Sequence, residues 1–420
     1  MTRNRHIQYK QPFAALDIGT SKVCCFIARA TDDAQLKILG VGQQMSRGLR
    51  SGNIIDMEAT EAAILNAVHD AEKMANETIR DIIVSISTGQ PTSLTTEIEI
   101  PLLGEEVTSQ DIKRTLAFED YHFKQNDDRW LIHAIPISYN LDGHKGIKDP
   151  KGMFGKKLAV DVHTISANST AVKNLTQCVS RCHLNIKSLI ISSYAAGLAS
   201  LVDDEMDLGV TVIDMGGGTT KLSVFFDGNI IYTDQIPIGG NHVTNDIARG
   251  LSTPLVYAER LKTLYGSCIS SLIDEQEIID IPLIGEEDSE QINQISRSIL
   301  VGIIQPRLEE TFELVRSRLE LSGFNKIAGR RVVLTGGASQ LTGARELASI
   351  VLDKKVRVGR PLRLVGLADS MSGPAFSTCA GLLIHAMEEN KNLSWYKNYN
   401  FKQKDTNLLN RLSHWLWSFL

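Results

Sequence analysis

The sequence contains one pattern twice: an apolar run, a polar glycine-containing turn, and a second apolar run. The first copy spans residues 13–28, and its turn reads Asp17-Ile18-Gly19-Thr20-Ser21-Lys22. The second spans residues 209–226, and its turn reads Asp214-Met215-Gly216-Gly217-Gly218-Thr219-Thr220-Lys221. Each copy predicts a β-hairpin. The copies lie much further apart than the roughly 20 to 50 residues of a solenoid repeat, so they predict two related halves with a cleft between them.

The rest of the chain has the pattern of an α/β protein with an insertion. Helical spacing of apolar residues at 56–76, with Asp56 as N-cap, precedes a buried strand at 81–87. Residues 88–164 change to short alternating strands, which indicates an inserted subdomain. Further strands are expected at 37–43, 93–100, 130–141, 186–192, 209–214 and 331–335, and further helices at 109–118, 168–182, 242–249, 254–265, 292–322 and 375–388.

The first turn has the residues needed to bind a phosphate. Its glycine allows successive backbone N–H groups to converge on one anion, and Thr20 and Ser21 add hydroxyl donors. Lys22 adds a cation, and Asp17 can hold Mg²⁺ through water. Taken alone, such a motif is more often an ordinary hairpin turn.

The second turn is harder to explain as a simple connection, because three consecutive glycines carry a large conformational-entropy cost. Close approach of the backbone to a ligand accounts for them better. A third element, Leu334-Thr335-Gly336-Gly337-Ala338-Ser339, places two glycines between a buried strand and a helix, where bare backbone can lie against a nucleoside.

These three elements, in this order, resemble the superfamily of actin, the sugar kinases and the heat-shock chaperones. The resemblance implies ATP and Mg²⁺ as ligands. Residues 258–266 are similar to the helix whose Glu and Lys contact ribose and adenine, which assigns that role to Glu259 and Lys262; a solvated helix face is the alternative. The expected nucleotide-binding residues are Asp17, Gly19, Thr20, Ser21, Lys22, Asp214, Gly216, Gly217, Gly218, Thr219, Thr220, Lys221, Gly239, Gly240, Glu259, Lys262, Gly336, Gly337, Ala338 and Ser339, with Asp17 and Asp214 holding Mg²⁺ through water.

Within that superfamily the chain resembles the FtsA family of bacterial division proteins. The resemblance rests on the run Asp17-Ile18-Gly19-Thr20-Ser21-Lys22-Val23, the insertion after Ile86, the run Ile304-Gln305-Pro306-Arg307, and a polar linker with an amphipathic end. It implies an actin-like two-lobed fold with a duplicated ATPase core, an inserted small α+β subdomain, and a C-terminal amphipathic helix on a flexible linker. The expected parts are a first lobe (13–87, 165–208 and 373–388), an inserted subdomain of the type called 1C (88–164), a second lobe (209–253 and 327–372), an outer subdomain (254–326), a linker (389–405) and the terminal helix (406–420).

The family resemblance also implies partners and a place of action. Such a protein polymerises at the inner face of the cytoplasmic membrane at the division site, anchors FtsZ filaments and recruits later division proteins. The outer subdomain would bind the FtsZ tail. Arg297 and Arg307 are the expected contacts for that tail, although a salt bridge on a helix surface would explain either residue.

The last fifteen residues predict a membrane-surface helix. As a helix they would be about 22 Å long, less than the ~30 Å of the hydrocarbon core, so the segment is expected to lie in the interface. Docking on the protein's own core is the alternative. The residues expected to meet the membrane are Leu408, Leu409, Arg411, Leu412, Trp415, Leu416, Trp417, Phe419 and Leu420.

Hydrolysis of ATP is not expected to be fast. Enzymes of the superfamily carry a Gln or Glu that orients the attacking water, and the alignment places Ser192 at that position. Serine is shorter and is no useful base at neutral pH. The sequence therefore predicts ATP binding with weak or absent turnover.

Other classes of protein fit less well. A formal net charge of -5 gives no general attraction to nucleic acid. The six cysteines have no zinc-site spacing and are expected to be reduced. Because no apolar run reaches the ~20 residues that cross a bilayer, a cytoplasmic chain with peripheral membrane contact is expected. A small-molecule kinase of the same superfamily remains the alternative, although it would need a catalytic carboxylate and has no use for an amphipathic end. A heat-shock chaperone would need a β-rich domain after the core.

Overall fold

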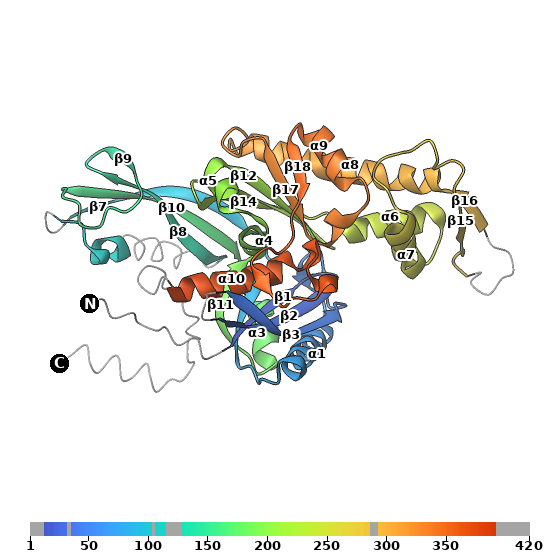
Figure 1. Ribbon diagram of the computed structural model, residues 1–420, viewed down its shortest axis with the longest axis horizontal. Coiled ribbons are helices and arrows are strands. Elements are labelled where there is room, and N and C mark those ends of the chain that lie inside the picture. Colours follow the sequence, from blue (N-terminus) through green and yellow to red (C-terminus); the bar gives the residue numbers. More distant parts are fainter. Residues whose placement is uncertain (1–11, 32–34, 103–105, 115–127, 286–292, 392–420) are drawn as a thin grey trace.

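The computed structural model describes residues 12–31, 35–102, 106–114, 128–285 and 293–391. Over these ranges the chain forms two lobes, each built on its own β-sheet, with a smaller unit projecting at either end (Figure 1). The predicted two-lobed α/β organisation is confirmed.

The first lobe is built on a six-stranded sheet with the order β11-β6-β1-β2-β3-β19. The predicted hairpin is β1 and β2, which pair antiparallel with Asp17 opposite Cys24. The elements are β1 (Phe13–Ile18), β2 (Lys22–Ala30), β3 (Leu36–Met45), the two-residue strands β4 (Leu49–Arg50) and β5 (Asn53–Ile54), α1 (Met57–Ala75), β6 (Asp81–Ile86), α3 (Ser169–Arg181), β11 (Asn185–Ile191) and β19 (Leu364–Val365).

Helix α1 covers one face of this sheet. The predicted cap is confirmed, since Asp56 Oδ1 accepts a hydrogen bond from the Ala59 N–H at 3.0 Å. The helix packs against β3 at very short range, because a Cβ added to Gly42 would lie 1.8 Å from the carbonyl oxygen of Ala67. Apolar positions along α1 are buried in the core of the first lobe.

The second lobe repeats the arrangement on a five-stranded sheet with the order β14-β13-β12-β17-β18. Its hairpin, β12 and β13, places Asp214 opposite Lys221, and β17 runs parallel to β12 with Thr335 beside Asp214. The carboxyl ends of β12 and β17 therefore meet at one edge of the sheet. The elements are α5 (Asp203–Leu208), β12 (Val210–Met215), β13 (Thr220–Phe226), β14 (Asn229–Ile236), β17 (Arg331–Thr335), α9 (Ala344–Leu352) and β18 (Lys355–Val358).

Helices α4 (Ser192–Ser200) and α10 (Ser377–Lys391) lie against each other between the two sheets (Figure 1). A Cβ on Gly381 would lie 1.7 Å from the carbonyl oxygen of Ala195, so the two helices are in close contact. Short 3₁₀ turns, η1 (Gly337–Gln340), η2 (Asp369–Met371) and η3 (Pro374–Phe376), bring the chain from β17 and β19 to the cleft and to α10.

The inserted subdomain has its own sheet, with the order β7-β10-β8-β9, and its own small core. It contacts β14 of the second lobe through β7, β8 and β10, and polar groups contribute to this contact. Ser93 Oγ accepts the Thr233 N–H at 2.9 Å and donates to the Thr233 carbonyl at 3.1 Å, and Lys148 pairs with Asp227 at 2.7 Å. The strands are β7 (Thr92–Pro101), β8 (Arg129–Leu141), β9 (His144–Ile147) and β10 (Lys157–Asn168).

The segment expected as the outer subdomain, 254–326, contains α7 (Leu255–Tyr265), β15 (Ile278–Ile281), β16 (Asn293–Ser296) and α8 (Arg297–Leu321), and α6 (Gly240–Leu251) of the second lobe packs against α7 and α8. The helix predicted at 292–322 is wrong at its start. Residues 293–296 form a strand paired with β15, and the Arg297 N–H donates to the Glu277 carbonyl at 2.8 Å. Pairing with a distant segment overrides the helical pattern there.

Smaller corrections concern element ends. The strand predicted at 186–192 ends at Ile191, and Ser192 begins α4. Gly209 ends α5 with φ +100° and lies before β12, where the sequence predicted strand. Of the helix predicted at 109–118, residues 109–114 are helical. Three predicted segments lie outside the described residues: the rest of that helix, residues 392–405 of the linker, and the whole helix at 406–420. Among the described helices, none is long and apolar enough to cross a membrane.

Candidate functional site

A cavity of about 550 Å³ lies between the two lobes, at the ends of both hairpins. It is lined by both hairpin turns, the start of α6, one face of α7 and the glycine pair after β17. All but one of the expected nucleotide-binding residues line it: Asp17, Gly19, Thr20, Ser21, Lys22, Asp214, Gly216, Gly217, Gly218, Thr219, Thr220, Lys221, Gly239, Gly240, Glu259, Lys262, Gly336, Gly337 and Ala338.

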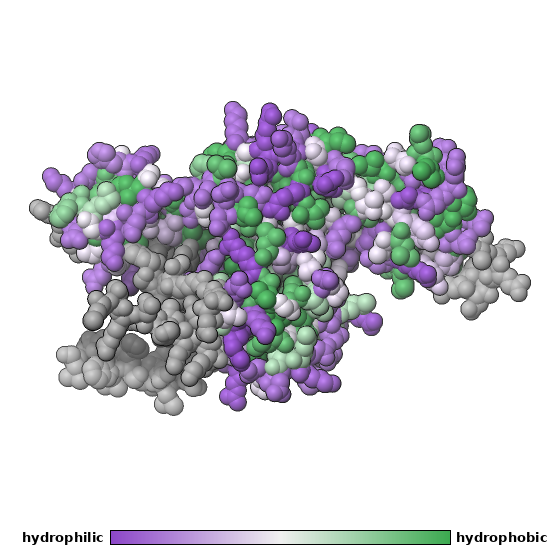
Figure 2. Space-filling model, viewed as in Figure 1, coloured by the Kyte–Doolittle hydropathy of each residue, from purple (hydrophilic) through white to green (hydrophobic). Residues whose placement is uncertain are grey.

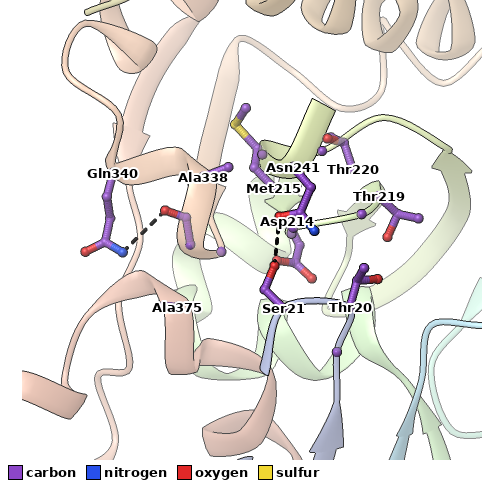
Figure 3. A pocket seen from close by; sticks show the side chains of 18 of the residues that line it. Thr20, Ser21, Asp214, Met215, Thr219, Thr220, Asn241, Ala338, Gln340 and Ala375 are labelled. Atoms are coloured by element: carbon purple, nitrogen blue, oxygen red, sulfur yellow. Dashed lines mark hydrogen bonds between the residues drawn. The ribbon is translucent and has the colours of Figure 1, made fainter. Parts of the chain in front are cut away.

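The two hairpin turns meet directly across this cleft. A Cβ on Gly217 would lie 1.8 Å from Ser21 Oγ, so only glycine lets the turns approach this closely. Ser21 Oγ also donates a hydrogen bond to Asn241 Oδ1 at 3.0 Å, which links the first lobe to α6 (Figure 3). Exposed backbone of both turns thus faces one shared space.

The carboxylates of the two turns carry different partners. Asp17 accepts a hydrogen bond from Ser85 Oγ at 2.7 Å, and Asp214 pairs with Lys221 at 3.2 Å. Burial raises the pKa of Asp17 above its ordinary value, and the nearby charge of Asp214 acts in the same direction.

These two carboxylates fit a hydrated Mg²⁺ ion. A divalent cation beside them would offset both the burial and the mutual repulsion of the two negative charges. Within the ranges that the structure describes, no three His, Cys, Asp or Glu side chains are arranged to hold a metal directly. An ion here would therefore take most of its ligands from water and from phosphate.

Lys22 supplies positive charge from the wall of the cavity. Its Nζ lies 3.3 Å from the centre of the Phe376 ring, a cation–π contact between β2 and η3. Burial lowers the pKa of Lys22. A bound anion would favour the charged form of this lysine.

Glu259 and Lys262 belong to one hydrogen-bond network, in which the Lys262 side chain is mostly buried and that of Glu259 is 53% exposed. Lys262 Nζ donates to Glu259 Oε2 at 2.7 Å, to Thr244 Oγ1 at 2.8 Å and to the Gly240 carbonyl at 3.2 Å. Thr244 in turn donates to Glu259 at 2.5 Å. The two side chains therefore have fixed positions on the cavity wall beside the start of α6.

The glycine pair borders the cavity through backbone. Gly336 has φ +84°, and a Cβ there would lie 2.4 Å from Asp214 Oδ1. Ser339 is the expected residue that does not line the cavity; it is buried and its hydroxyl donates to the Gly336 carbonyl at 2.7 Å. Its position indicates support for the glycine turn.

Several cavity residues were missed in the sequence. Asn241 follows the predicted pair Gly239-Gly240, so its place at the start of a helix could have indicated it. Phe376 and Gln43 carry no such signal, because each reaches the cavity only through the pairing of distant elements.

Ser192, the residue aligned with the water-orienting position, does not line the cavity. It is fully buried at the start of α4, and its hydroxyl has no hydrogen-bond partner within the described part of the chain.

Arg297 and Arg307 both form ion pairs within the chain. Arg297 binds Asp274 and Glu277, each at 3.1 Å. Arg307 binds Asp246 at 2.5 Å and also pairs with Glu310. Both arginines are therefore held in place by carboxylates of the second lobe and its outer subdomain.

Comparison with known proteins agrees with this architecture. A chain of the solved "PilM-PilN type IV pilus biogenesis complex" superposes with a TM-score of 0.64 at 17% identity, over 89% of this chain and 98% of that one. MreB5 of Spiroplasma citri bound to ADP superposes with a TM-score of 0.55 at 16% identity, over 92% and 99%. These likenesses show that the chain has an actin-like fold.

Sequence relatives make the assignment more specific. Residues 211–381 match the family described as "Cell division protein FtsA", and residues 88–166 match the "SHS2 domain inserted in FTSA". The cell division protein FtsA of Agrobacterium fabrum is 46% identical over 382 residues, covering 89% of this chain and 86% of that protein. FtsA of Neisseria meningitidis serogroup B is 38% identical over 412 residues, covering 97% and 99%. The chain belongs to the FtsA family of cell division proteins.

Proposed function

We propose that this chain binds ATP with Mg²⁺ in the inter-lobe cavity, polymerises at the inner face of the cytoplasmic membrane, anchors FtsZ filaments there and recruits later division proteins. The observation that carries the proposal is the convergence of both hairpin turns, the Glu259–Lys262 pair and the Gly336–Gly337 turn on one cavity of about 550 Å³. A related fold with ADP bound, that of MreB5, supports a nucleotide as the ligand.

The geometry gives each part of a nucleotide a place. The two turns present backbone N–H groups, hydroxyls and Lys22 to a phosphate chain, and Asp17 with Asp214 suits the hydrated cation that accompanies it. The glycine turn at Gly336 leaves bare backbone for the nucleoside. We propose that Glu259 and Lys262 contact the ribose and base.

Turnover is proposed to be weak or absent. The Ser192 side chain does not reach the cavity wall, because it is buried at the start of α4. Binding rather than hydrolysis would then determine the state of the protein, and nucleotide would act by holding the two lobes together.

The outer subdomain supports the proposed contact with FtsZ. Large apolar side chains are exposed along it, and Figure 2 shows green areas on this end of the molecule. Exposed apolar patches of this kind mark protein interaction sites. The most exposed include Leu255, Val256, Leu264, Leu272, Ile273, Ile284 and Leu321. We propose that Arg297 and Arg307 border the site of the FtsZ tail.

Membrane attachment is proposed to depend on the terminal helix at 406–420. One short amphipathic helix binds weakly, because interfacial burial is partial and folding costs about 1–2 kcal/mol per residue. A filament would present many such helices together and make the attachment firm.

Co-sedimentation with anionic liposomes tests the proposal. The full chain and a chain ending at Lys404 are compared with and without ATP and Mg²⁺. The full chain should sediment with the liposomes, more so with ATP, and the shortened chain should stay in solution. Equal sedimentation of both chains, or of neither, would contradict the membrane-adaptor function and favour a small-molecule kinase.

A further inference from the structure

A second cavity of about 250 Å³ adjoins the first at the tips of the two hairpin turns. Thr20, Gly218 and Asn241 line both cavities and so form the boundary between them. At this boundary a Cβ on Gly218 would lie 2.5 Å from Thr20 Oγ1. The contact of the turn tips therefore forms part of the boundary between the two spaces.

Arginine side chains dominate the wall of the second cavity. Arg50, Arg249 and Arg307 line it, against one carboxylate, that of Asp246. Asp246 is already bound by Arg307, through Nε at 2.5 Å and a second nitrogen at 3.2 Å. Glu310, the other partner of Arg307, does not line the cavity.

Arg50 and Arg249 have no carboxylate partner within the residues that the structure describes. They come from opposite lobes and face one space, so their positive charges repel each other across it. Both side chains are exposed to solvent, and an anion in the cavity would offset this repulsion.

The local backbone holds these groups in place. Arg50 starts the tight turn between β4 and β5, where Ser51 has φ +46° and Gly52 has φ +81°. The Gly52 N–H donates to Thr20 Oγ1 at 3.0 Å, which ties this turn to the first phosphate loop. The backbone that carries Arg50 is thus positioned relative to the hairpin tip.

Helix α6 supplies the opposite wall. His242, Asp246 and Arg249 lie at positions i, i+4 and i+7, which share one helical face. His242 Nδ1 accepts the Gly239 N–H at 3.1 Å, so in the neutral ring the proton lies on Nε2. The ring then adds an N–H donor to the two free guanidinium groups.

We propose that this second cavity is an oxyanion site for a phosphate group, contiguous with the nucleotide cavity. Guanidinium groups bind phosphate through paired, charge-assisted hydrogen bonds. The group would be either free inorganic phosphate or the terminal phosphate of a nucleotide held in the first cavity, since the same donors would bind either.

The test is a titration with inorganic phosphate, followed by ³¹P NMR in chloride buffer. The wild type is compared with the double variant Arg50→Gln/Arg249→Gln, with and without saturating ADP. A matched control, Arg80→Gln/Arg330→Gln, removes the same charge from two exposed arginines that precede β6 and β17, at the strand ends away from both cavities.

Wild type and control should bind phosphate equally, with ADP present as well as without it. The double variant should bind it about tenfold more weakly for each arginine lost. Phosphate binding that is absent from the wild type, or equal in the double variant, would overturn the proposal.

Nucleotide affinities identify the source of the phosphate group. If the terminal phosphate of ATP occupies the site, the double variant should lose affinity for ATP and keep its affinity for ADP. If free phosphate occupies it, both affinities should stay unchanged while phosphate binding is lost. A chain that binds phosphate but no nucleotide would keep this inference and contradict the function proposed above.

Discussion

Replacing Gly239 by alanine should weaken nucleotide binding without unfolding the protein. Gly239 precedes α6 with an extended backbone, φ -159°, that alanine adopts without strain. The added Cβ, however, would lie 2.6 Å from the Gly216 carbonyl oxygen and 2.7 Å from both the Gly217 carbonyl oxygen and the Thr219 nitrogen. All three atoms belong to the backbone of the second turn, so the turn itself must move.

The size of the effect follows from that contact. The turn is held by the Gly240 N–H, which donates to the Gly216 carbonyl at 2.9 Å, and by the Asn241 N–H, which donates to the Gly217 carbonyl at 2.7 Å. Overpacking at such a site costs about 1–3 kcal/mol. If the turn must return to its original position to hold phosphate, this cost raises the dissociation constant for ATP by about fivefold to 150-fold.

Isothermal titration calorimetry with ATP and Mg²⁺ measures the change. Gly302→Ala is the matched control, because Gly302 is exposed on α8 and an added Cβ there meets no atom within 4 Å. The control should bind ATP as the wild type does and melt at the same or a slightly higher temperature. ATP binding by Gly239→Ala that equals the control would refute the close contact between α6 and the second turn.

Three further substitutions test packing and charge. Gly381→Ala should lower the free energy of unfolding by about 1–3 kcal/mol, because the added Cβ would lie 1.7 Å from the Ala195 carbonyl oxygen. An unchanged urea midpoint would be evidence against the contact between α4 and α10. Arg357→Gln should cost about 3 kcal/mol at pH 7, because it leaves the buried carboxylate of Glu205 without the guanidinium that binds it at 2.8 Å. Burial acts to raise the pKa of Glu205, but hydrogen bonds from Arg357 keep that pKa below its ordinary value. The difference in free energy of unfolding between wild type and variant should therefore shrink as the pH falls below about 4.5, and a constant difference would contradict this. His385→Leu removes an imidazole whose pKa burial lowers to about 4, whereas the unfolded chain takes up this proton below about pH 6.5. The free energy of unfolding of the wild type should therefore fall from about pH 6.5 towards pH 4, by up to about 1.4 kcal/mol per pH unit, and that of the variant should fall less steeply. Equal slopes in urea titrations would contradict the buried neutral imidazole.

The sequence predicted the fold and most of the cavity because its strongest signals are local. A hairpin with its turn is a short continuous segment, and the same segment carries the residues that line the cavity, such as Gly19 and Gly217. Because the hairpin occurs twice in the sequence, two related lobes with a cleft between them could be predicted. Asp56 likewise predicted the start of α1 from its own side chain.

The features that the sequence did not predict depend on contacts between distant segments. Phe376 lies under Lys22 only because η3, which comes near the end of the described chain, packs beside β2. Residues 293–296 share helical spacing with the start of α8, but pairing with β15 makes them a strand. Ser339 comes soon after the glycine pair in sequence, yet the 3₁₀ turn directs its side chain into the protein. Local patterns carry no information on such contacts.

Calorimetric titration of the purified full chain with ATP in the presence of Mg²⁺ tests the central claim most directly. The convergence of both turns on one cavity predicts saturable binding at one site per chain, with ADP competing for it. Absence of saturable binding, or saturable binding of more than one ATP per chain, would contradict a nucleotide held between the two lobes.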